Sequence, residues 1–404
     1  MQLNPMTENT NFSNNELLVI LKEDKSLEKN ITMISDLVSS NNGKILEIHP
    51  PRILIVKVDT NTKETISESP LVENVYSGLV QDSDKYQIND TSSLVIDAWN
   101  LRKSESFRDA KSSREDEGVT WDYHQKTSDG DQLTSEEEKE KGLGLKGCDI
   151  PVEDSDALES TTGAAAPTNT SEYMIGKVAI GVIIVDGPSG TDVKFSDQEL
   201  TKVVAEVQEG SNILINLSPP GANLSFVYDI QKVQLNLNSS SVSDEQQWRN
   251  PAMSMLGYPA GSAGLYNYLQ HLRTNKWPGI TVDWAYIAFF TKYEASWFAY
   301  ATLGGPRLVM QYSNNGWGPD QIDRVFAHET GHIFGAPDEY SKSRCNTEEI
   351  FGHLRVPNCN CEVNNPSSIA CIMKSNSSAI CTCSIGHFGW RDTNNNGIPD
   401  PIDN

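Results

Sequence analysis

The residues best suited to chemistry are the two histidines and the glutamate of the stretch HETGH at positions 328–332. On a helix, His328 and His332 lie on one face one turn apart, so both imidazoles can bind one metal ion. Glu329, next to the first histidine, points toward a water molecule on that ion. The spacing therefore predicts a catalytic Zn2+ site for hydrolysis, with Glu329 as the general base.

The residues after this stretch supply a third ligand. Gly335 can adopt the positive φ that ends a helix and turns the chain back toward the metal. Asp338 is then the predicted third zinc ligand. Glu339 is an alternative, as is a carboxylate on a following helix, Glu349 or Glu362.

The sequence ahead of the histidines favours the helix that must carry them. Asp320 and Asp323 suit its first turn, because carboxylates complement the positive end of a helix dipole. Ile322, Val325 and Phe326 recur at helical spacing and supply a buried face.

The surrounding pattern is that of an α/β domain. Residues 178–185 form a continuous apolar run, typical of a strand that is covered on both faces. Ser196 and Glu199 form a capping box that starts a long amphipathic helix. Further strands are expected at residues 224–230, 284–290 and 307–312.

The extended pattern H-E-x-x-H-x-x-G-x-x-D resembles that of the metzincin zinc endopeptidases, and Asp338 in the last position resembles their snapalysin-like branch. The resemblance implies that His328 and His332 are zinc ligands and that Met373 forms the methionine turn beneath the metal. Ser375 stands where some metzincins have a tyrosine, so oxyanion stabilisation is expected to come from the zinc itself. In such enzymes the strand before the active-site helix pairs with an extended peptide substrate.

The first part of the chain predicts a smaller α+β domain in the order βαββαβ. Strands are expected at residues 16–21, 45–48, 53–58 and 72–80, with a helix around residues 31–38 and a short polar one before the last strand. The pattern resembles the ferredoxin-like propeptide domains that inhibit secreted proteases and assist their folding. A domain of unrelated purpose is the alternative, because this fold hosts many functions.

Residues 81–175 predict a flexible acidic linker, because charge-rich and small residues bury too little apolar area to offset chain entropy. A docking element around Trp99 is its one expected ordered part. Cys148 lies in this linker and could hold the precursor inactive through a thiolate on the zinc. A free or intermolecularly paired thiol is the alternative.

Six of the seven cysteines lie close together, at positions 345, 359, 361, 371, 381 and 383. They predict three disulfides and hence an oxidising, extracellular compartment, although no signal peptide is visible in the given chain. A structural zinc site built from the pairs Cys359/Cys361 and Cys381/Cys383 is the alternative.

The C-terminal stretch 392–403 has the spacing of a Ca2+-binding loop, with glycine at its sixth position. The predicted calcium ligands are Asp392, Asn394, Asn396, Ile398 through its carbonyl, Asp400 and Asp403. The loop resembles those of dockerin-like and thrombospondin-type repeats. Its few carboxylates predict weak binding, on the order of 10⁻⁴ to 10⁻³ M, whereas a solvated Asn-rich turn is the alternative.

Composition and charge argue against nucleic acid as a partner and against a transmembrane segment. A chain of 404 residues with 37% apolar residues can bury a sizeable core, and its formal net charge of -23 makes nucleic acid an unsuitable partner. No apolar run is long enough for a transmembrane segment.

We therefore predict four parts: an inhibitory domain at 1–80, a linker at 81–175, a metzincin-like α/β (α+β) catalytic domain at 176–390 and a calcium loop at 391–404. The predicted function is a secreted zinc endopeptidase that acts on protein or peptide substrates, with its own N-terminal domain as an intramolecular inhibitor. The alternative is an inactive, calcium-dependent surface or matrix binding protein. His353 and His387 receive no assignment, and His49, His124 and His271 are expected to serve structure or to face solvent.

Overall fold

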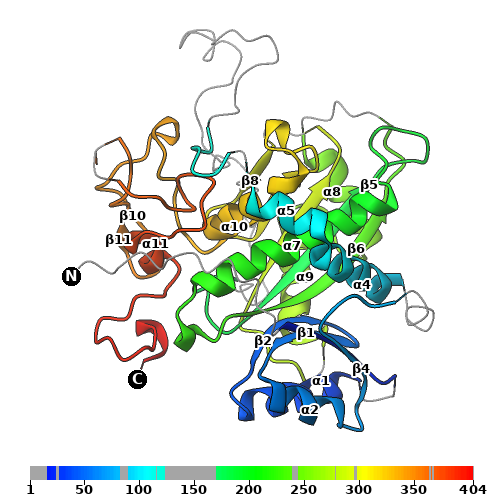
Figure 1. Cartoon of the computed structure of the whole chain (residues 1–404). Coiled ribbons are helices and arrows are strands. Elements are labelled where there is room, and N and C mark those ends of the chain that lie inside the picture. The colour runs from blue at the N-terminus through cyan, green and yellow to red at the C-terminus, as the bar shows by residue number, and fades with distance from the viewer. Residues whose placement is uncertain are drawn as a thin grey trace, which may run out of the picture. The chain divides into compact units, whose positions relative to one another are not determined.

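The computed structural model describes residues 16–23, 27–81, 90–114, 116–122, 170–238, 244–277, 279–294, 298–363, 365 and 368–403 (Figure 1). The chain divides into two compact units, Met1–Glu115 and Asp116–Asn404. The boundary falls inside the range 81–175 that the sequence predicts as a linker. Among the described residues, no helix is long and apolar enough to cross a membrane.

The N-terminal unit begins with six elements: β1 (Glu16–Leu21), α1 (Leu27–Ser40), β2 (Lys44–His49), β3 (Ile53–Lys57), α2 (Thr60–Ser67) and β4 (Val72–Tyr76). This is the predicted βαββαβ order. β1 pairs antiparallel with both β3 and β4, and β2 pairs antiparallel with β3, so the strands lie in the order β4-β1-β3-β2. α1 packs on β1 and β2.

Two further helices, α4 (Asp90–Lys103) and α5 (Glu105–Ser112), lie in the range predicted as a flexible linker. Trp99 of α4 is fully buried and donates its indole N–H to the Gly78 carbonyl at 2.8 Å. Arg102 reaches the carboxylates of Glu16 and Glu47, at 3.8 and 3.7 Å. The Arg102 charge is therefore paired within the unit, and the predicted docking element is one part of a longer helix.

The sheet of the larger unit is mostly parallel. Its strands are β5 (Lys177–Asp186), β6 (Ser225–Gln234), β7 (Trp284–Thr291), β8 (Ala299–Ala301) and β9 (Arg307–Gln311). The order is β6-β5-β7-β9-β8, with parallel pairing throughout except between β8 and β9. β5 lies between two neighbours and is buried along nearly its whole length, as its continuous apolar run predicts. The chain therefore belongs to the α/β class.

The long helix α7 (Asp197–Leu217) begins with the predicted capping box of Ser196 and Glu199. It packs along α10 (Ile322–Ile333), which carries the histidines (Figure 1). A Cβ on Gly210 would lie 2.5 Å from the Asp323 carbonyl oxygen, so glycine is what lets the two helices approach this closely.

The remaining elements connect and cover this core. They are α8 (Gln246–Met255), α9 (Gly261–Thr274), β10 (Ile350–Phe351), β11 (Val356–Pro357), α11 (Thr382–His387) and the short 3₁₀ helices η1 (Pro220–Ala222), η2 (Asn314–Gly316), η3 (Pro319–Gln321), η4 (Ser341–Ser343) and η5 (Asp400–Ile402). The region after α10 has little regular structure and is held by two disulfides, Cys345–Cys361 and Cys359–Cys383.

Candidate metal centre

The helix α10 is buried along its entire length. It starts after η3, close to where the sequence predicts, and the Asp323 N–H in its first turn donates to the Glu206 carboxylate at 3.0 Å. Glu206 is itself fully buried on α7. This bond satisfies one of the amides that a helix start leaves open, and it anchors α10 to α7.

Three side chains of this region converge on one point. His328 Nε2 and His332 Nε2 are 3.1 Å apart, and Asp338 Oδ1 lies 3.3 Å from each of them. All three residues are at most 2% exposed. The structure thus brings together the three side chains that the sequence predicts as zinc ligands.

Backbone carbonyls fix the orientation of both imidazoles. His328 Nδ1 lies 3.0 Å from the Ile372 oxygen, and His332 Nδ1 lies 2.7 Å from the Ala336 oxygen. A carbonyl oxygen only accepts, so each Nδ1 carries the hydrogen and each Nε2 of a neutral ring presents a lone pair. Burial lowers the pKa of His328 although Asp338 opposes this, which favours the neutral ring.

The spacing of the three atoms suits a tetrahedral zinc ion. Ligand atoms about 2.0–2.1 Å from such an ion lie roughly 3.3–3.4 Å from one another. The observed separations are 3.1 to 3.3 Å. Two imidazoles and a carboxylate are also a donor set that catalytic zinc sites use, with the fourth position left for water. The residues present therefore fit Zn2+.

Asp338 is oriented by groups around it. The Tyr340 hydroxyl donates to its Oδ2 at 3.1 Å, which leaves Oδ1 on the side of the histidines. The Asn358 amide donates to its backbone carbonyl at 2.8 Å. Burial alone would raise the pKa of Asp338, but the neighbouring His332 and His328 outweigh it and hold the pKa well below its usual range. The carboxylate is therefore ionised and ready to bind a cation.

Gly335 makes the turn that returns the chain to the histidines. Its φ is +85°, as the sequence predicts, and its N–H donates to the His332 carbonyl at 2.9 Å. The Ala336 N–H donates to the Gly331 carbonyl at 3.0 Å. These bonds close the end of the helix around a residue in the left-handed region.

Met373 lies directly against the histidine helix. It is fully buried, and a Cβ on Gly331 would lie 2.4 Å from its sulfur. The turn around it is closed by the Lys374 N–H, which donates to the Cys371 carbonyl at 2.9 Å. The Met373 carbonyl accepts the Glu339 N–H at 3.0 Å, so this turn also supports the segment that carries Asp338.

Glu329 is fully buried beside His328 and His332. A carboxylate oxygen of Glu329 and one ring nitrogen from each of His328 and His332 lie within 4.8 Å of one another. A buried carboxylate at this distance is in position to exchange a proton with a group held between the ligands.

The carboxylates considered as alternative third ligands have other surroundings. Glu339 accepts hydrogen bonds from Asn360 and Ser384, at 2.6 and 2.9 Å. Glu349 is exposed to solvent, whereas both histidines are buried. The Glu362 N–H pairs with the Glu339 carbonyl at 2.9 Å. Among the candidates for third ligand, Asp338 is the carboxylate that has an oxygen 3.3 Å from both histidines.

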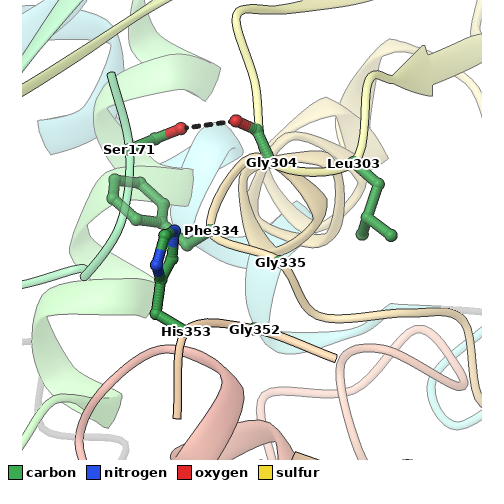
Figure 2. Close-up of a pocket in the computed structure, with 7 residues that line it drawn as sticks. All are labelled: Ser171, Leu303, Gly304, Phe334, Gly335, Gly352 and His353. Atoms are coloured by element: carbon green, nitrogen blue, oxygen red, sulfur yellow. Dashed lines mark hydrogen bonds between the residues drawn. The ribbon is translucent and has the colours of Figure 1, made fainter. Parts of the chain in front are cut away.

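A pocket of about 240 Å³ lies at the carboxyl end of α10 (Figure 2). It is lined by Ser171, Leu303, Gly304, Phe334, Gly335, Gly352 and His353. The Ser171 hydroxyl donates to the Gly304 carbonyl at 3.0 Å and closes one wall. The pocket is next to the ligand-bearing turn but does not contain the three converging atoms, so it is a neighbour of the metal centre and not the centre itself.

The cysteines depart in part from the predicted pattern. Cys359 and Cys361 belong to two different disulfides, which removes the zinc site built from Cys-x-Cys pairs. Cys371 and Cys381 are buried thiols, and their sulfurs lie within 4.8 Å of each other and of a Glu339 oxygen. Two of the three predicted disulfides are therefore formed, and the third pair of cysteines is adjacent.

The predicted calcium loop folds back on itself. Gly397 has a φ of +86° and donates its N–H to Asp392 at 2.8 Å. The Asn396 N–H donates to the side-chain oxygen of Asn394 at 3.0 Å. The side-chain amides of Asn394 and Asn396 donate to the Asp403 carboxylate, at 2.6 and 3.1 Å. Four of the six predicted calcium ligands therefore lie close together.

Asp400 is turned to other partners in the same loop. It accepts from Arg391 at 2.7 Å and from the Thr393 N–H at 2.8 Å, and these bonds lower its pKa. The Ile398 N–H donates to the side-chain oxygen of Asn396 at 2.8 Å, so Ile398 also belongs to this turn. A Cβ on Gly221 would lie 2.0 Å from the Gly397 carbonyl, which shows that the loop packs on η1.

The other histidines are placed as structural groups where the structure describes them. His49 pairs with Glu47 at 2.8 Å, and His271 packs on the Tyr258 ring. His387 is buried with Nε2 3.1 Å from the Val356 oxygen, and His353 lies in the pocket wall. Cys148 and His124 lie outside the described residues.

One residue of this centre was not anticipated from the sequence. Trp121, in the predicted linker, packs its ring on His328 with 5.1 Å between ring centroids. An isolated tryptophan in a polar, charge-rich stretch was the signal available, since such a residue gains most from burial. The same signal at Trp99 did predict a docking element.

No protein-family model matches the chain, and no curated protein matches it significantly.

Proposed function

We propose that the chain is a zinc-dependent endopeptidase of the metzincin type. The observation that carries this proposal is the convergence of two imidazole nitrogens and one carboxylate oxygen, 3.1 to 3.3 Å apart, beside the buried Glu329. The turn at Gly335 and the buried Met373 under α10 add two further features of that class.

In this proposal His328, His332 and Asp338 hold the zinc ion, which when bound supplies a Lewis acid for water activation and for the scissile carbonyl. Glu329 takes the proton from the attacking water and delivers it to the leaving amine. The carbonyls of Ile372 and Ala336 keep both imidazoles in the ligand tautomer throughout.

The substrate proposed is an extended peptide. β9, the strand that the sequence suggested for substrate pairing, is interior and lies between β7 and β8. β8 pairs only with β9 among the described strands, and the proposed peptide would add to its other edge as an antiparallel strand. Leu303 and Gly304, in the loop after β8, line the pocket, and this pocket is the proposed side-chain subsite.

The N-terminal unit is proposed as an intramolecular inhibitor with a ferredoxin-like fold. Its βαββαβ order and the strand order β4-β1-β3-β2 support the fold, and the resemblance to protease propeptides supports the role. The two disulfides support export to an oxidising compartment.

The experiment that tests the enzyme combines activity with metal content. Glu329→Gln should retain zinc near one equivalent but lose at least about 100-fold in casein hydrolysis, because it removes a base and not a ligand. His332→Ala should lose both. Glu349→Gln is the control, because this exposed glutamate was an alternative third ligand. It should change neither the zinc content nor the casein hydrolysis. Zinc-free wild-type protein, or full activity in Glu329→Gln, would refute the proposal.

We also propose a structural Ca2+ at the 392–403 loop. The side chains of Asp392, Asn394, Asn396 and Asp403 are already gathered there, and the loop is packed on η1. Millimolar Ca2+ should raise the melting temperature of the wild type but not of Asp392→Ala, because a ligand that binds only the folded state stabilises it. If millimolar Ca2+ does not change the melting temperature of the wild type, the calcium site is ruled out.

A further inference from the structure

Residues 116–122, here called the 116–122 segment, belong to the larger unit although the sequence assigns them to a linker. The Gly118 N–H donates to the Asn376 carbonyl at 2.7 Å, and the Asn376 N–H donates to the Val119 carbonyl at 2.9 Å. Thr120 and Ser375 form an antiparallel bridge. The segment therefore pairs with the chain that leaves the Met373 turn.

Trp121 joins this segment to the metal centre. It is 2% exposed, and its ring centroid lies 5.1 Å from those of His328 and Trp317. Its indole N–H donates to the Ile372 carbonyl at 2.7 Å. That carbonyl also accepts the His328 Nδ1–H at 3.0 Å. A carbonyl oxygen has two lone pairs, so one oxygen serves both donors.

Trp121 is hydrogen-bonded on the Nδ1 side of the His328 imidazole, and this position determines the role that Trp121 can have. The shared Ile372 carbonyl lies at Nδ1, and Nδ1 points away from the Nε2 that faces His332 and Asp338. Trp121 is thus anchored behind the ligand, on the side of the Met373 turn. This contact is made at the carbonyl on the Nδ1 side of the imidazole, away from the Nε2 that faces His332 and Asp338.

Both ends of the segment are tied to the same region. Glu117 pairs with Arg324 of α10 at 3.3 Å, one turn before His328. The Lys342 ammonium donates to the Asp122 carbonyl at 3.3 Å. These contacts hold the segment in register, so that Trp121 meets His328 and not a neighbouring residue.

We propose that Trp121 is a positioning residue for the His328 ligand and that the 116–122 segment is a permanent part of the catalytic unit. The inference rests on the proposed zinc site. If the N-terminal unit is removed by cleavage, we expect the cut to lie at or before Asp116. A cut further along the chain would remove part or all of the 116–122 segment, which supports His328. Groups that hold a ligating histidine commonly change metal affinity by about 10–100-fold when they are lost.

The test uses the full chain, with zinc affinity measured by chelator competition and the visible spectrum of the Co2+-substituted protein. Trp121→Ala should weaken zinc binding about 10–100-fold and shift the Co2+ bands, because His328 loses its packing and the carbonyl loses its second donor. Trp121→Phe keeps an aromatic ring without the N–H and should fall between Trp121→Ala and the wild type. Trp248→Ala is the matched control, because Trp248 is equally buried but packs on Phe289.

Each outcome separates this inference from the proposed function. If the wild type binds no zinc, the proposed function fails. If the wild type binds zinc but Trp121→Phe and Trp121→Ala keep the affinity and spectrum of Trp248→Ala, the positioning role is overturned. Should Trp121→Ala not fold, the Trp121→Phe comparison decides. The denatured mass of the active form should include residues 116–122, and an active form without them would overturn the processing inference.

Discussion

Two buried imidazole lone pairs and a buried carboxylate oxygen face one another across 3.1 to 3.3 Å. A core does not keep such an arrangement without a positive charge, because water is excluded and the electron pairs repel. Burial lowers the pKa of His328 and so disfavours protonation of that ring. A metal cation satisfies all three atoms at once, which is the physical reason to prefer it.

His387 gives a residue-scale prediction that concerns stability. It is buried, and burial lowers its pKa to about 4, although its hydrogen bond to Val356 opposes this. The unfolded chain takes up this proton near pH 6.5 and the folded chain only near pH 4. The free energy of unfolding should therefore fall by on the order of 3 kcal/mol between pH 6.5 and pH 4, and this group should contribute no slope above that range.

The variant His387→Gln isolates this effect. Glutamine can donate to the Val356 carbonyl as His387 does but does not titrate. Urea unfolding in the presence of a chelator should show a flatter pH dependence for the variant than for the wild type. Parallel curves between pH 4 and pH 6.5 would contradict the assignment.

The residues of the candidate metal centre fall into two groups, those whose contacts are close along the chain and those whose contacts are distant. The pair of histidines, Glu329 and Gly335 could be predicted because helical periodicity and one turn determine their mutual positions. Trp121 could not, since it bonds to a carbonyl 251 positions away and lies in a stretch of polar composition. Contacts of that range depend on how the whole unit packs, which local patterns do not encode.

At the scale of elements, long and regular hydrophobic patterns predicted helices and strands correctly, whereas short or irregular patterns did not. β5 and α7 could be predicted because one is a continuous apolar run and the other is amphipathic with a capping box. α8 contains Pro251, and β8 has only three residues, so neither carries a clear period. α4 could not be predicted in full, because Arg102 of this helix pairs with Glu16 and Glu47, which lie far along the chain.

Gly335→Ala tests the turn that ends α10. A non-glycine residue in the left-handed region costs about 1–2 kcal/mol, and the new Cβ would also lie 3.1 Å from the Gly352 Cα. Gly190→Ala is the control, because its φ is +82° and nothing lies within 4 Å of the added Cβ. Both variants should lower the melting temperature, but only Gly335→Ala should also weaken zinc binding. Equal zinc affinity in the two would show that the turn does not place Asp338.

The adjacent Cys371 and Cys381 test the disulfide prediction. The Cys381 N–H donates to the Cys371 sulfur at 3.3 Å, and burial raises the pKa of Cys371, which favours the neutral Cys371 thiol. In an oxidising compartment we expect them to form the third disulfide by exchange with a disulfide oxidant. Titration of the denatured, unreduced protein should then find one thiol, and none in Cys148→Ser. Three thiols in the wild type would contradict this expectation.

On the scale of the whole molecule, the order of elements along the chain predicted the fold class better than it predicted the boundaries between parts. Alternating strands and helices indicate a largely parallel sheet, which the larger unit has. The division falls between Glu115 and Asp116, well past the end of the predicted inhibitory domain at residue 80. The difference arises because α4 and α5 complete the N-terminal unit, while the 116–122 segment completes the other one.

This division leads to a prediction about latency. A specific protease site inserted between Glu115 and Asp116 would separate the two units while leaving Trp121 in the larger one. A tethered inhibitor acts at an effective concentration near 1 mM, so a unit that binds with a micromolar Kd suppresses activity by roughly 1000-fold, and cleavage followed by dilution should restore that factor in kcat/KM. Cleaved Glu329→Gln should stay inactive, which excludes the added protease as the source. Equal activity before and after cleavage would mean that the N-terminal unit has a purpose other than inhibition.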